Sequence, residues 1–188
     1  MKNVLIALLC SLSLNFALTA NAAEVEFITN KGVILVKVDE EKAPITAKNF
    51  LDYVNEGFFD GLIFHRVIPN FVIQGGGFET QMKRRAVKAP IQNEASNGLK
   101  NLKYTLSMAR TNDPHSATSQ FFINLKDNTN LDPSAASAGY AVFAKVIAGE
   151  EVVDAIAKVP TGTHGPFRDV PKEEVIIEKA VVVDGKLE

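Results

Sequence analysis

The chain has 188 residues, a formal net charge of −2, and 22% charged against 46% hydrophobic residues. These values are typical of a globular domain, and they exclude a disordered, collagen-like or coiled-coil chain. A chain so close to neutrality lacks the clustered positive charge that neutralises nucleic-acid phosphates, so we expect no nucleic-acid partner. We expect one domain with a sizeable core.

The first 22 residues have the pattern of a secretory signal peptide. Lys2 precedes an apolar run over 4–18, and the sequence Ala-Asn-Ala at 20–22 has the small residues that a signal peptidase recognises. Polar residues interrupt the run, which makes it too weak for stable insertion into a membrane. We therefore expect residues 1–22 to be removed and residues 23–188 to form an exported domain, located in the periplasm.

In the expected mature chain, β-branched and aromatic residues form short runs bounded by turn-forming residues, which predicts strands. The expected strands are 25–28, 33–38, 62–67, 71–74, 102–109, 120–125, 141–146 and 174–183. One helix is expected to begin at Pro44 and to stop at Gly57, and a second to span 150–158. Many strands without regular βαβ alternation indicate an antiparallel sandwich or a closed barrel whose open ends are covered by helices.

Two polar loops, 79–101 and 126–139, are long enough to be functional or mobile. The first contains four basic residues, Lys83, Arg84, Arg85 and Lys88. Because charge elsewhere in the chain does not reinforce this basic cluster, we interpret it as a solvated surface.

The signatures of common hydrolases, nucleotide-binding proteins and zinc enzymes are absent. The chain has no G-x-S-x-G, P-loop, H-E-x-x-H or G-x-G-x-x-G sequence. Its histidines, His65, His115 and His164, are scattered singly, so no metal site is predicted. The one cysteine, Cys10, lies in the expected leader, which excludes thiol catalysis and disulfides from the mature chain.

The stretches FHRVIPNFVIQGGGF at 64–78 and SQFFINL at 119–125 carry the most information. Alternation along a strand directs one set of side chains into the core and the other set outward. The outward set contains Gln74, Gln120 and Phe122.

Arg66 adds a guanidinium to this outward set. The result is a group of fixed hydrogen-bond donors beside apolar side chains, with neither a nucleophile nor an evident general base. Such a set suits the binding of an extended peptide and the stabilisation of a distorted amide.

At these residues the sequence resembles the cyclophilins, which are peptidyl-prolyl cis-trans isomerases, and most of all the exported cyclophilins of bacterial envelopes. The resemblance covers essentially all of the mature chain. It is carried by EVEFITNKGVILVKV, FHRVIPNFVIQGGGF, LSMARTNDPHSATSQFFINL and GYAVFAKV. It implies a mainly β fold, a closed eight-stranded antiparallel β-barrel capped by two α-helices, with the active surface on the outside of a filled barrel.

By motif position, Arg66, Gln74 and Phe122 resemble the family's catalytic residues. Further residues resemble its proline pocket and peptide-binding groove: Phe71, Val72, Ala109, Arg110, Gln120, Leu131 and Tyr140. The resemblance implies no cofactor and no metal. The implied partners are unfolded or partly folded exported proteins with X-Pro bonds, bound by a monomer.

The sequence departs from the family's usual pattern at four positions. Val72 replaces a Met, Arg110 an Asn, Tyr140 a His, and Asn130 the Trp of many eukaryotic members. These changes bear on ligand preference. Cyclosporin is expected to bind weakly, because Asn130 offers neither an indole face nor its N–H.

Two other functions remain open from the residues alone. The same groove could hold partly folded chains as a chaperone without useful catalysis. A secreted hydrolase would need a serine beside a histidine, and the candidate residues for that pair are Ser107, Ser119, His65 and His115.

Overall fold

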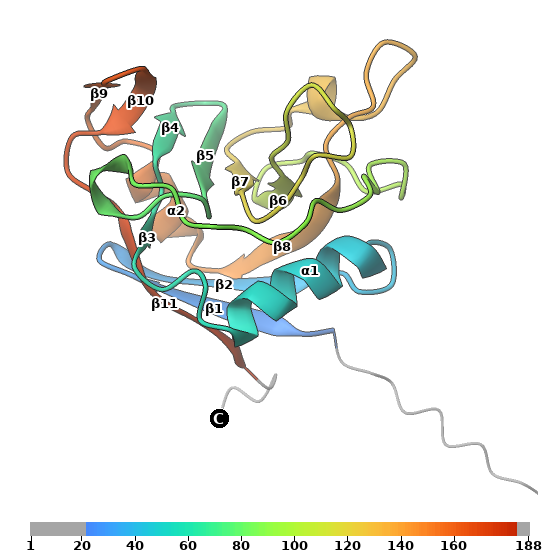
Figure 1. Ribbon diagram of the computed structural model, residues 1–188, viewed down its shortest axis with the longest axis horizontal. Helices are drawn as coiled ribbons and strands as arrows, with labels where there is room; N and C mark the ends of the chain where they lie inside the picture. Colours follow the sequence, from blue (N-terminus) through green and yellow to red (C-terminus); the bar gives the residue numbers. More distant parts are fainter. Residues whose placement is uncertain (1–21, 184–188) are drawn as a thin grey trace, which may run out of the picture.

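The computed structural model describes residues 22–183, so the expected leader lies outside the described residues except for Ala22 (Figure 1). Nine strands of the described chain form one antiparallel sheet. These strands are β1 (Glu24–Thr29), β2 (Gly32–Val38), β3 (Leu62–Ile63), β4 (Arg66–Ile68), β5 (Val72–Gly75), β6 (Thr105–Met108), β7 (Phe121–Asn124), β8 (Val142–Ala148) and β11 (Ile176–Val183). The prediction of a mainly β fold is confirmed.

The sheet has the strand order β3-β11-β1-β2-β8-β6-β7-β5-β4 and is strongly curled. Its two edge strands, β3 and β4, are consecutive in the chain and are separated only by Phe64 and His65. Because one short segment supplies both edges, the sheet must curl round so that its two edges come close together. If 62–68 is counted as one interrupted strand, the sheet contains the eight strands that the resemblance implied.

The inside of the curled sheet is filled by aromatic side chains. Phe121 of β7 is fully buried, and its ring lies 5.4–6.2 Å from the rings of Phe27, Phe50, Phe59 and Phe64. Such stacked and edge-on pairs add to the free energy gained by burying apolar area. The expected alternation is confirmed here, because Phe121 belongs to the core and its neighbours along β7 point the other way.

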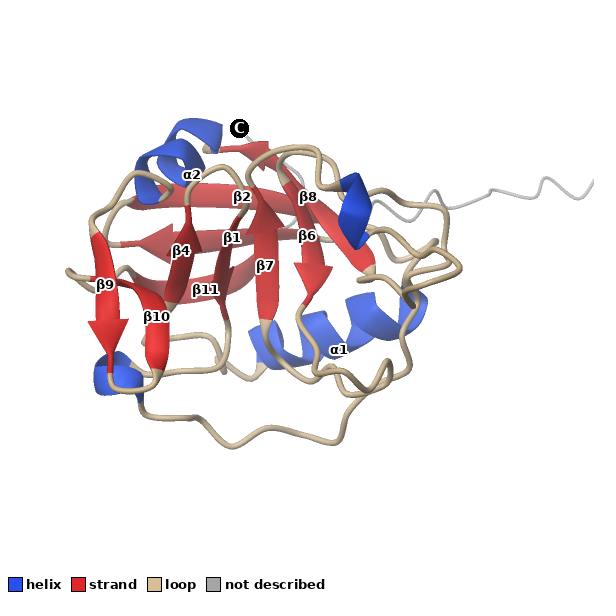
Figure 2. Ribbon diagram, turned by 90° about the horizontal axis from the view of Figure 1, so that it is seen from above, coloured by secondary structure: helices blue, strands red, loops and turns tan. Residues whose placement is uncertain are grey.

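Two helices cover the curled sheet, as expected, and lie on opposite sides of it in Figure 2. α1 (Pro44–Asn55) begins at the predicted proline. The carboxylate of Glu94, from the long loop 79–101, accepts hydrogen bonds from the backbone N–H groups of Ile45 and Thr46 at 3.1 and 2.7 Å. It thereby satisfies donors that every helix start leaves unpaired. α2 (Glu150–Ile156) packs on β2 and is shorter than predicted.

The strand expected over 102–109 begins only at Thr105. Tyr104 adopts a left-handed conformation with φ of 68°, which interrupts an extended strand. The last strand likewise begins at Ile176 instead of residue 174.

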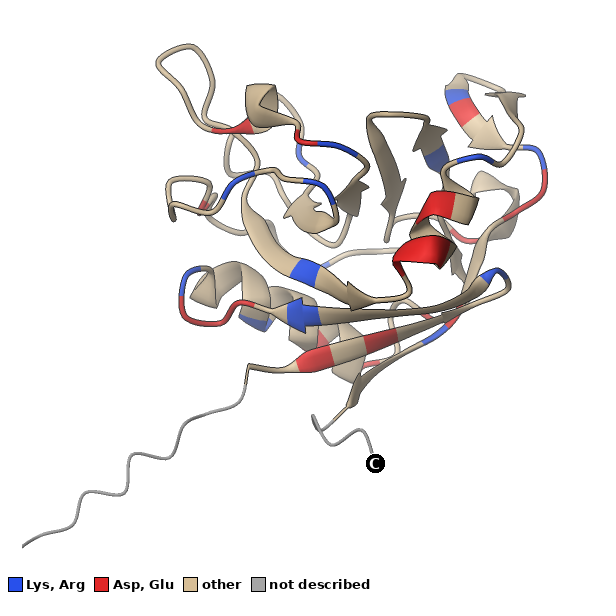
Figure 3. Ribbon diagram, turned by 180° about the vertical axis from the view of Figure 1, so that it is seen from behind, with Lys and Arg blue, Asp and Glu red and all other residues tan. Residues whose placement is uncertain are grey.

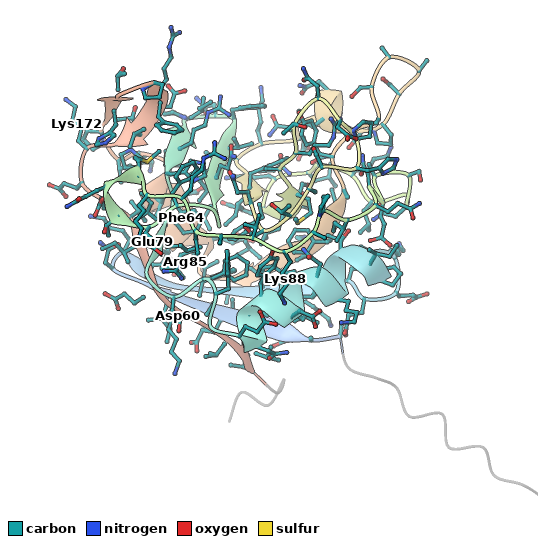
Figure 4. All side chains as sticks on the ribbon, in the orientation of Figure 1. Asp60, Phe64, Glu79, Arg85, Lys88 and Lys172 are labelled. Atoms are coloured by element: carbon teal, nitrogen blue, oxygen red, sulfur yellow. The ribbon has the colours of Figure 1, made fainter. Side chains whose placement is uncertain are left out.

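The basic cluster is not simply a solvated surface, which corrects the sequence interpretation. Figure 4 labels Arg85 between Glu79 and Asp60. Its Nη1 donates to the backbone carbonyls of Phe58 and Asp60 at 2.6 and 2.9 Å, and its Nε donates to Glu79 at 2.9 Å. Arg85 thus fastens the long loop to the segment that follows α1.

A second sheet, which the sequence analysis missed, consists of the hairpin β9 (Thr161–His164) and β10 (Phe167–Pro171). Phe167 packs edge-on against Phe78 at 5.3 Å, and β10 lies against β4. In Figure 3 the hairpin carries adjacent basic and acidic positions near β4. The outer face of the large sheet near Arg66 is therefore bordered by this hairpin.

Candidate active site

The residues singled out from the sequence converge on one pocket of about 220 Å³ on the outside of the curled sheet. Nine of them line it: Arg66, Phe71, Val72, Gln74, Ala109, Arg110, Phe122, Leu131 and Tyr140. The tenth, Gln120, lies beside this lining, and its Oε1 accepts a hydrogen bond from Gln74 Nε2 at 3.0 Å. The structure thus brings together all ten predicted positions.

The strand register explains how the three predicted catalytic residues meet. Arg66 of β4 pairs with Gln74 of β5, and Gln74 pairs with Phe122 of β7. Residues paired directly across antiparallel strands point to the same face of a sheet. Arg66, Gln74 and Phe122 therefore form one row across three neighbouring strands, facing away from the core.

An apolar wall stands beside this row. Val72 and Phe122 are buried, and Phe71 and Leu131 are half-buried. Leu131 comes from η2 (Thr129–Leu131), a single 3₁₀ turn within the loop that the sequence analysis noted as long. A shallow apolar wall of this size accommodates one small ring or aliphatic side chain.

A buried polar network behind the pocket holds this wall in place. Asn128 Nδ2 donates to the carbonyl of Phe71 and to Asn124 Oδ1, both at 2.9 Å. Asn101 donates to Asp132 Oδ1 from its backbone N–H and from Nδ2, also at 2.9 Å. Buried polar groups linked in this way fix loop geometry, because each lost partner leaves a costly unpaired atom.

Arg66 is oriented by a residue that sequence reasoning missed. Its Nε lies 3.8 Å from Oδ2 of Asp169 on β10, and both side chains are 42% exposed. Asp169 has a φ of 60°, a left-handed conformation that non-glycine residues seldom adopt and that Asp tolerates better than most. The only sequence signal for this ion pair was a Gly-Pro turn at 165–166, which indicates a hairpin but not its partner strand.

The serines and histidines offer no hydrolytic pair. Ser107 Oγ donates to Asn101 Oδ1 at 2.7 Å, and Ser119 Oγ donates to the carbonyl of Gly76 at 2.6 Å. Both hydroxyls thus serve buried structural bonds. The hydrolase hypothesis loses its nucleophile, since a catalytic serine needs a base within hydrogen-bond reach.

His65 adjoins Arg66 in sequence but does not line the pocket. Its ring is buried and packs on Phe78 at 4.6 Å between ring centres. Burial, reinforced by the positive charges of Arg66 and Arg84, lowers the pKa of the His65 imidazole from 6.5 to about 4. His65 is therefore neutral at physiological pH and lies outside the pocket lining.

This environment predicts how activity and stability depend on pH. Activity on an uncharged X-Pro peptide should be nearly flat from about pH 6 to 8.5, because no group in the pocket acts as a proton-transfer base. Stability should fall as the pH drops from 6.5 towards 4, because in that window the unfolded imidazole binds a proton that the folded one does not. The change in His65 protonation alone should lower the free energy of unfolding by about 3 kcal/mol across this window.

Chemical unfolding at several pH values, with His65→Gln as the comparison, measures that contribution. The variant should show a shallower acid limb, while its kcat/KM profile should match that of the wild type. A tenfold rise of kcat/KM between pH 6 and 7.5 that vanished in the variant would instead assign His65 a role in catalysis.

The remaining described residues can be compared with this pocket for cavities, metal ligands and membrane spans. A larger cavity of about 750 Å³ lies between β2, β8 and residues 99–102, away from Arg66. Among residues 22–183, no three His, Cys, Asp or Glu side chains are grouped as metal ligands would be. In the same range, no helix is both long and apolar enough to cross a membrane.

Comparisons with known proteins identify the family of this chain. Residues 24–182 match the family described as cyclophilin type peptidyl-prolyl cis-trans isomerase. A peptidyl-prolyl cis-trans isomerase of Acinetobacter baylyi is 61% identical over 153 residues, which cover 81% of each chain. Peptidyl-prolyl cis-trans isomerase B of Escherichia coli is 58% identical over 161 residues, covering 85% of this chain and 98% of its own.

Solved structures give the same result at lower sequence identity. A crystal structure of a Cryptosporidium parvum cyclophilin type isomerase superposes with a TM-score of 0.73 at 27% identity, covering 88% of this chain and 99% of its own. With the family match spanning nearly all described residues, the chain belongs to the cyclophilin-type peptidyl-prolyl cis-trans isomerases.

Proposed function

We propose that this isomerase is exported and acts in the periplasm on the X-Pro bonds of unfolded or partly folded exported proteins. The leader pattern at 1–22 supports export, and the family match begins directly after it, at residue 24. The alignment with the Escherichia coli relative takes in 98% of that relative but only 85% of this chain. Part of this chain therefore lies outside the domain that the two proteins share.

Export should remove residues 1–22 and leave Ala23 as the first residue. The cut would fall just before β1, which begins at Glu24, so the sheet loses no strand. Intact-mass measurement of protein recovered from the periplasmic fraction of an expressing bacterium tests this. Protein that keeps Met1 to Ala22, or that stays with the cytosolic fraction, would contradict the proposal.

The chemical task of the pocket is to lower the barrier to rotation about one amide bond. Amide resonance sets this barrier at about 18–20 kcal/mol, and uncatalysed X-Pro isomerisation takes tens to hundreds of seconds. A turnover near 10³ per second corresponds to a barrier of about 13 kcal/mol. The site must therefore stabilise the twisted amide by roughly 5–7 kcal/mol more than the planar one.

In the twisted amide the prolyl nitrogen regains its lone pair, and a donor aimed at that nitrogen stabilises the twist selectively. Arg66 is the donor in this proposal, because it is the guanidinium in the row that also holds Gln74 and Phe122. That register is the observation that carries the proposal. The step needs no bond to form or break and no proton to move.

The apolar wall and the two glutamines complete the mechanism. Phe71, Val72, Phe122 and Leu131 would hold the proline ring while the preceding carbonyl turns. Gln74 and Gln120 hydrogen-bond each other, so their amides present fixed donors and acceptors to an extended peptide. A chaperone would bind peptides in the same groove but would not need the Arg66 donor. Substitution of Arg66 therefore distinguishes an isomerase from a chaperone.

Cyclosporin affinity offers a test of the 126–139 loop. Asn130 is exposed on η2, next to Leu131 of the apolar wall. Asn130→Trp should tighten cyclosporin binding, because an indole adds a large apolar face and an N–H donor beside the pocket. Isothermal titration of both proteins measures the difference. Unchanged or weaker binding would mean that position 130 does not correspond to the family's tryptophan.

A further inference from the structure

The pocket contains two arginines whose surroundings differ. Arg66 has the carboxylate of Asp169 within 3.8 Å. Arg110, which also lines the pocket, has no carboxylate within 4.0 Å among residues 22–183. Asp113, three residues further along, instead uses its Oδ1 to accept the backbone N–H of His115 at 2.9 Å. The pocket lining therefore carries one unneutralised positive charge, at Arg110.

Arg110 is nevertheless held in a fixed position. Its Nε donates to the carbonyl of Gly139 at 2.9 Å, and its Nη1 donates to that of Thr111 at 2.8 Å. Its guanidinium carbon lies 4.5 Å from the centre of the Tyr140 ring, which in turn packs edge-on against Phe122 at 5.6 Å. The apolar wall, Tyr140 and Arg110 therefore form one continuous stack.

These bonds leave part of the guanidinium free. An arginine has five N–H donors in a rigid fork, and the two carbonyls above use only two of them. The donors of Nη2 have no protein partner among the described residues. A planar fork whose stem is already immobilised loses little rotamer entropy on binding, and its geometry matches a carboxylate.

We propose that Arg110 forms a carboxylate subsite, so that this isomerase prefers X-Pro peptides that carry an Asp or Glu close to the proline. This inference rests on the function proposed for the groove and specifies its substrate class. The subsite lies in the same small pocket as the apolar wall, so the acidic side chain must come from a residue near the proline in the bound peptide. Tyr140 contributes by holding the guanidinium over its ring.

Blocked peptides test the preference directly. Each peptide has an acetylated N-terminus, an amidated C-terminus and a single proline, and carries either Glu or Gln at one of the two positions before or the two positions after it. Exchange spectroscopy by NMR gives kcat/KM without a coupling protease. At one of these positions, Glu should exceed Gln by about twofold to fivefold, which is the range expected for a partly exposed ion pair.

Two further measurements assign the preference to Arg110. The Glu-to-Gln ratio should fall to about one in Arg110→Gln, and it should persist in Lys179→Gln, which removes the same charge from an exposed position on β11. In the wild type, raising the ionic strength to 1 M should reduce the ratio while leaving the Gln peptide unaffected. The salt measurement does not depend on whether the Arg110 variant folds.

The possible outcomes separate this inference from the proposed function. Equal rates for Glu and Gln at all four positions, or a ratio that survives in Arg110→Gln, would overturn the carboxylate subsite while leaving the isomerase function intact. A second series of these peptides with a free C-terminal carboxylate tests the alternative ligand. A preference found only in that series would also overturn the subsite, by assigning Arg110 to chain ends. If the wild-type protein isomerised none of the neutral Gln peptides, that result would instead count against the proposed function of the groove.

Discussion

Arg66→Ala is expected to reduce kcat/KM for a short X-Pro peptide by about 100-fold to 1,000-fold, the range seen when one donor is removed from a charge-stabilising site. The loss should fall mainly on kcat, because in the proposed mechanism the guanidinium stabilises the prolyl nitrogen only in the twisted state. Affinity for the peptide should change much less, since the apolar wall stays in place. NMR exchange rates and titration of a non-isomerising analogue measure the two quantities.

Arg66→Lys should recover little of this activity. A lysine ammonium keeps the charge but lacks the planar fork with which Arg66 can face both Asp169 and a substrate nitrogen. Arg168→Ala is the matched control, because it removes an exposed guanidinium from the same hairpin without touching the pocket lining. If Arg66→Ala kept more than half of the wild-type kcat/KM, the fixed-donor mechanism would be wrong and simple peptide binding would remain.

The row of Arg66, Gln74 and Phe122 could be anticipated from sequence because it depends on local rules. Alternation along a strand decides which side chains face outward, and the apolar partners of each strand identify the core side. Ile73 and Phe121, which separate the outward residues along their strands, are both fully buried. The structure adds the register between strands, which no single stretch of sequence contains.

Asp169 and Arg85 could not be anticipated, for a different physical reason. Asp169 reaches Arg66 through a hairpin whose packing on β4 depends on a distant aromatic contact between Phe78 and Phe167. Arg85 donates hydrogen bonds to the backbone carbonyls of Phe58 and Asp60. Contacts to backbone atoms leave no pattern in the side chains of the sequence. The basic residues of the loop are therefore interpreted as solvated from sequence alone, although Arg85 holds the loop to the segment that follows α1.

The buried polar network was also invisible in the sequence, where its members are separate asparagines in polar loops. Asn101 is fully buried and joins three segments. Its Oδ1 accepts from Ser107 Oγ at 2.7 Å, its Nδ2 donates to Asp132, and the backbone N–H of Asn128 donates to its carbonyl at 2.7 Å. One of these segments, the loop 126–139, contains both Asn128, which bonds the carbonyl of Phe71, and Leu131 of the apolar wall. The network therefore couples folding to the shape of the pocket.

Asn101→Ala should therefore destabilise the protein by about 2–5 kcal/mol, because it leaves the buried Ser107 hydroxyl without its acceptor and removes one of the two N–H donors to Asp132 Oδ1. The midpoint of thermal unfolding should fall by roughly 5–15 °C for a domain of this size. At temperatures where the variant is still folded, KM should rise more than kcat falls, since the 126–139 loop loses a support while Arg66 keeps its place. Asn130→Ala, an exposed asparagine in that loop, is the control and should leave stability nearly unchanged.

A double variant distinguishes loss of the network from loss of packing. Ser107→Ala removes the hydroxyl that Asn101→Ala would strand, so the double variant should be less destabilised than the sum of the two single variants. Chemical unfolding of the wild type, both single variants and the double variant gives this coupling energy. Strictly additive losses would show that Asn101 acts by filling space, and a variant with unchanged KM would show that the network stabilises the fold without shaping the proline pocket.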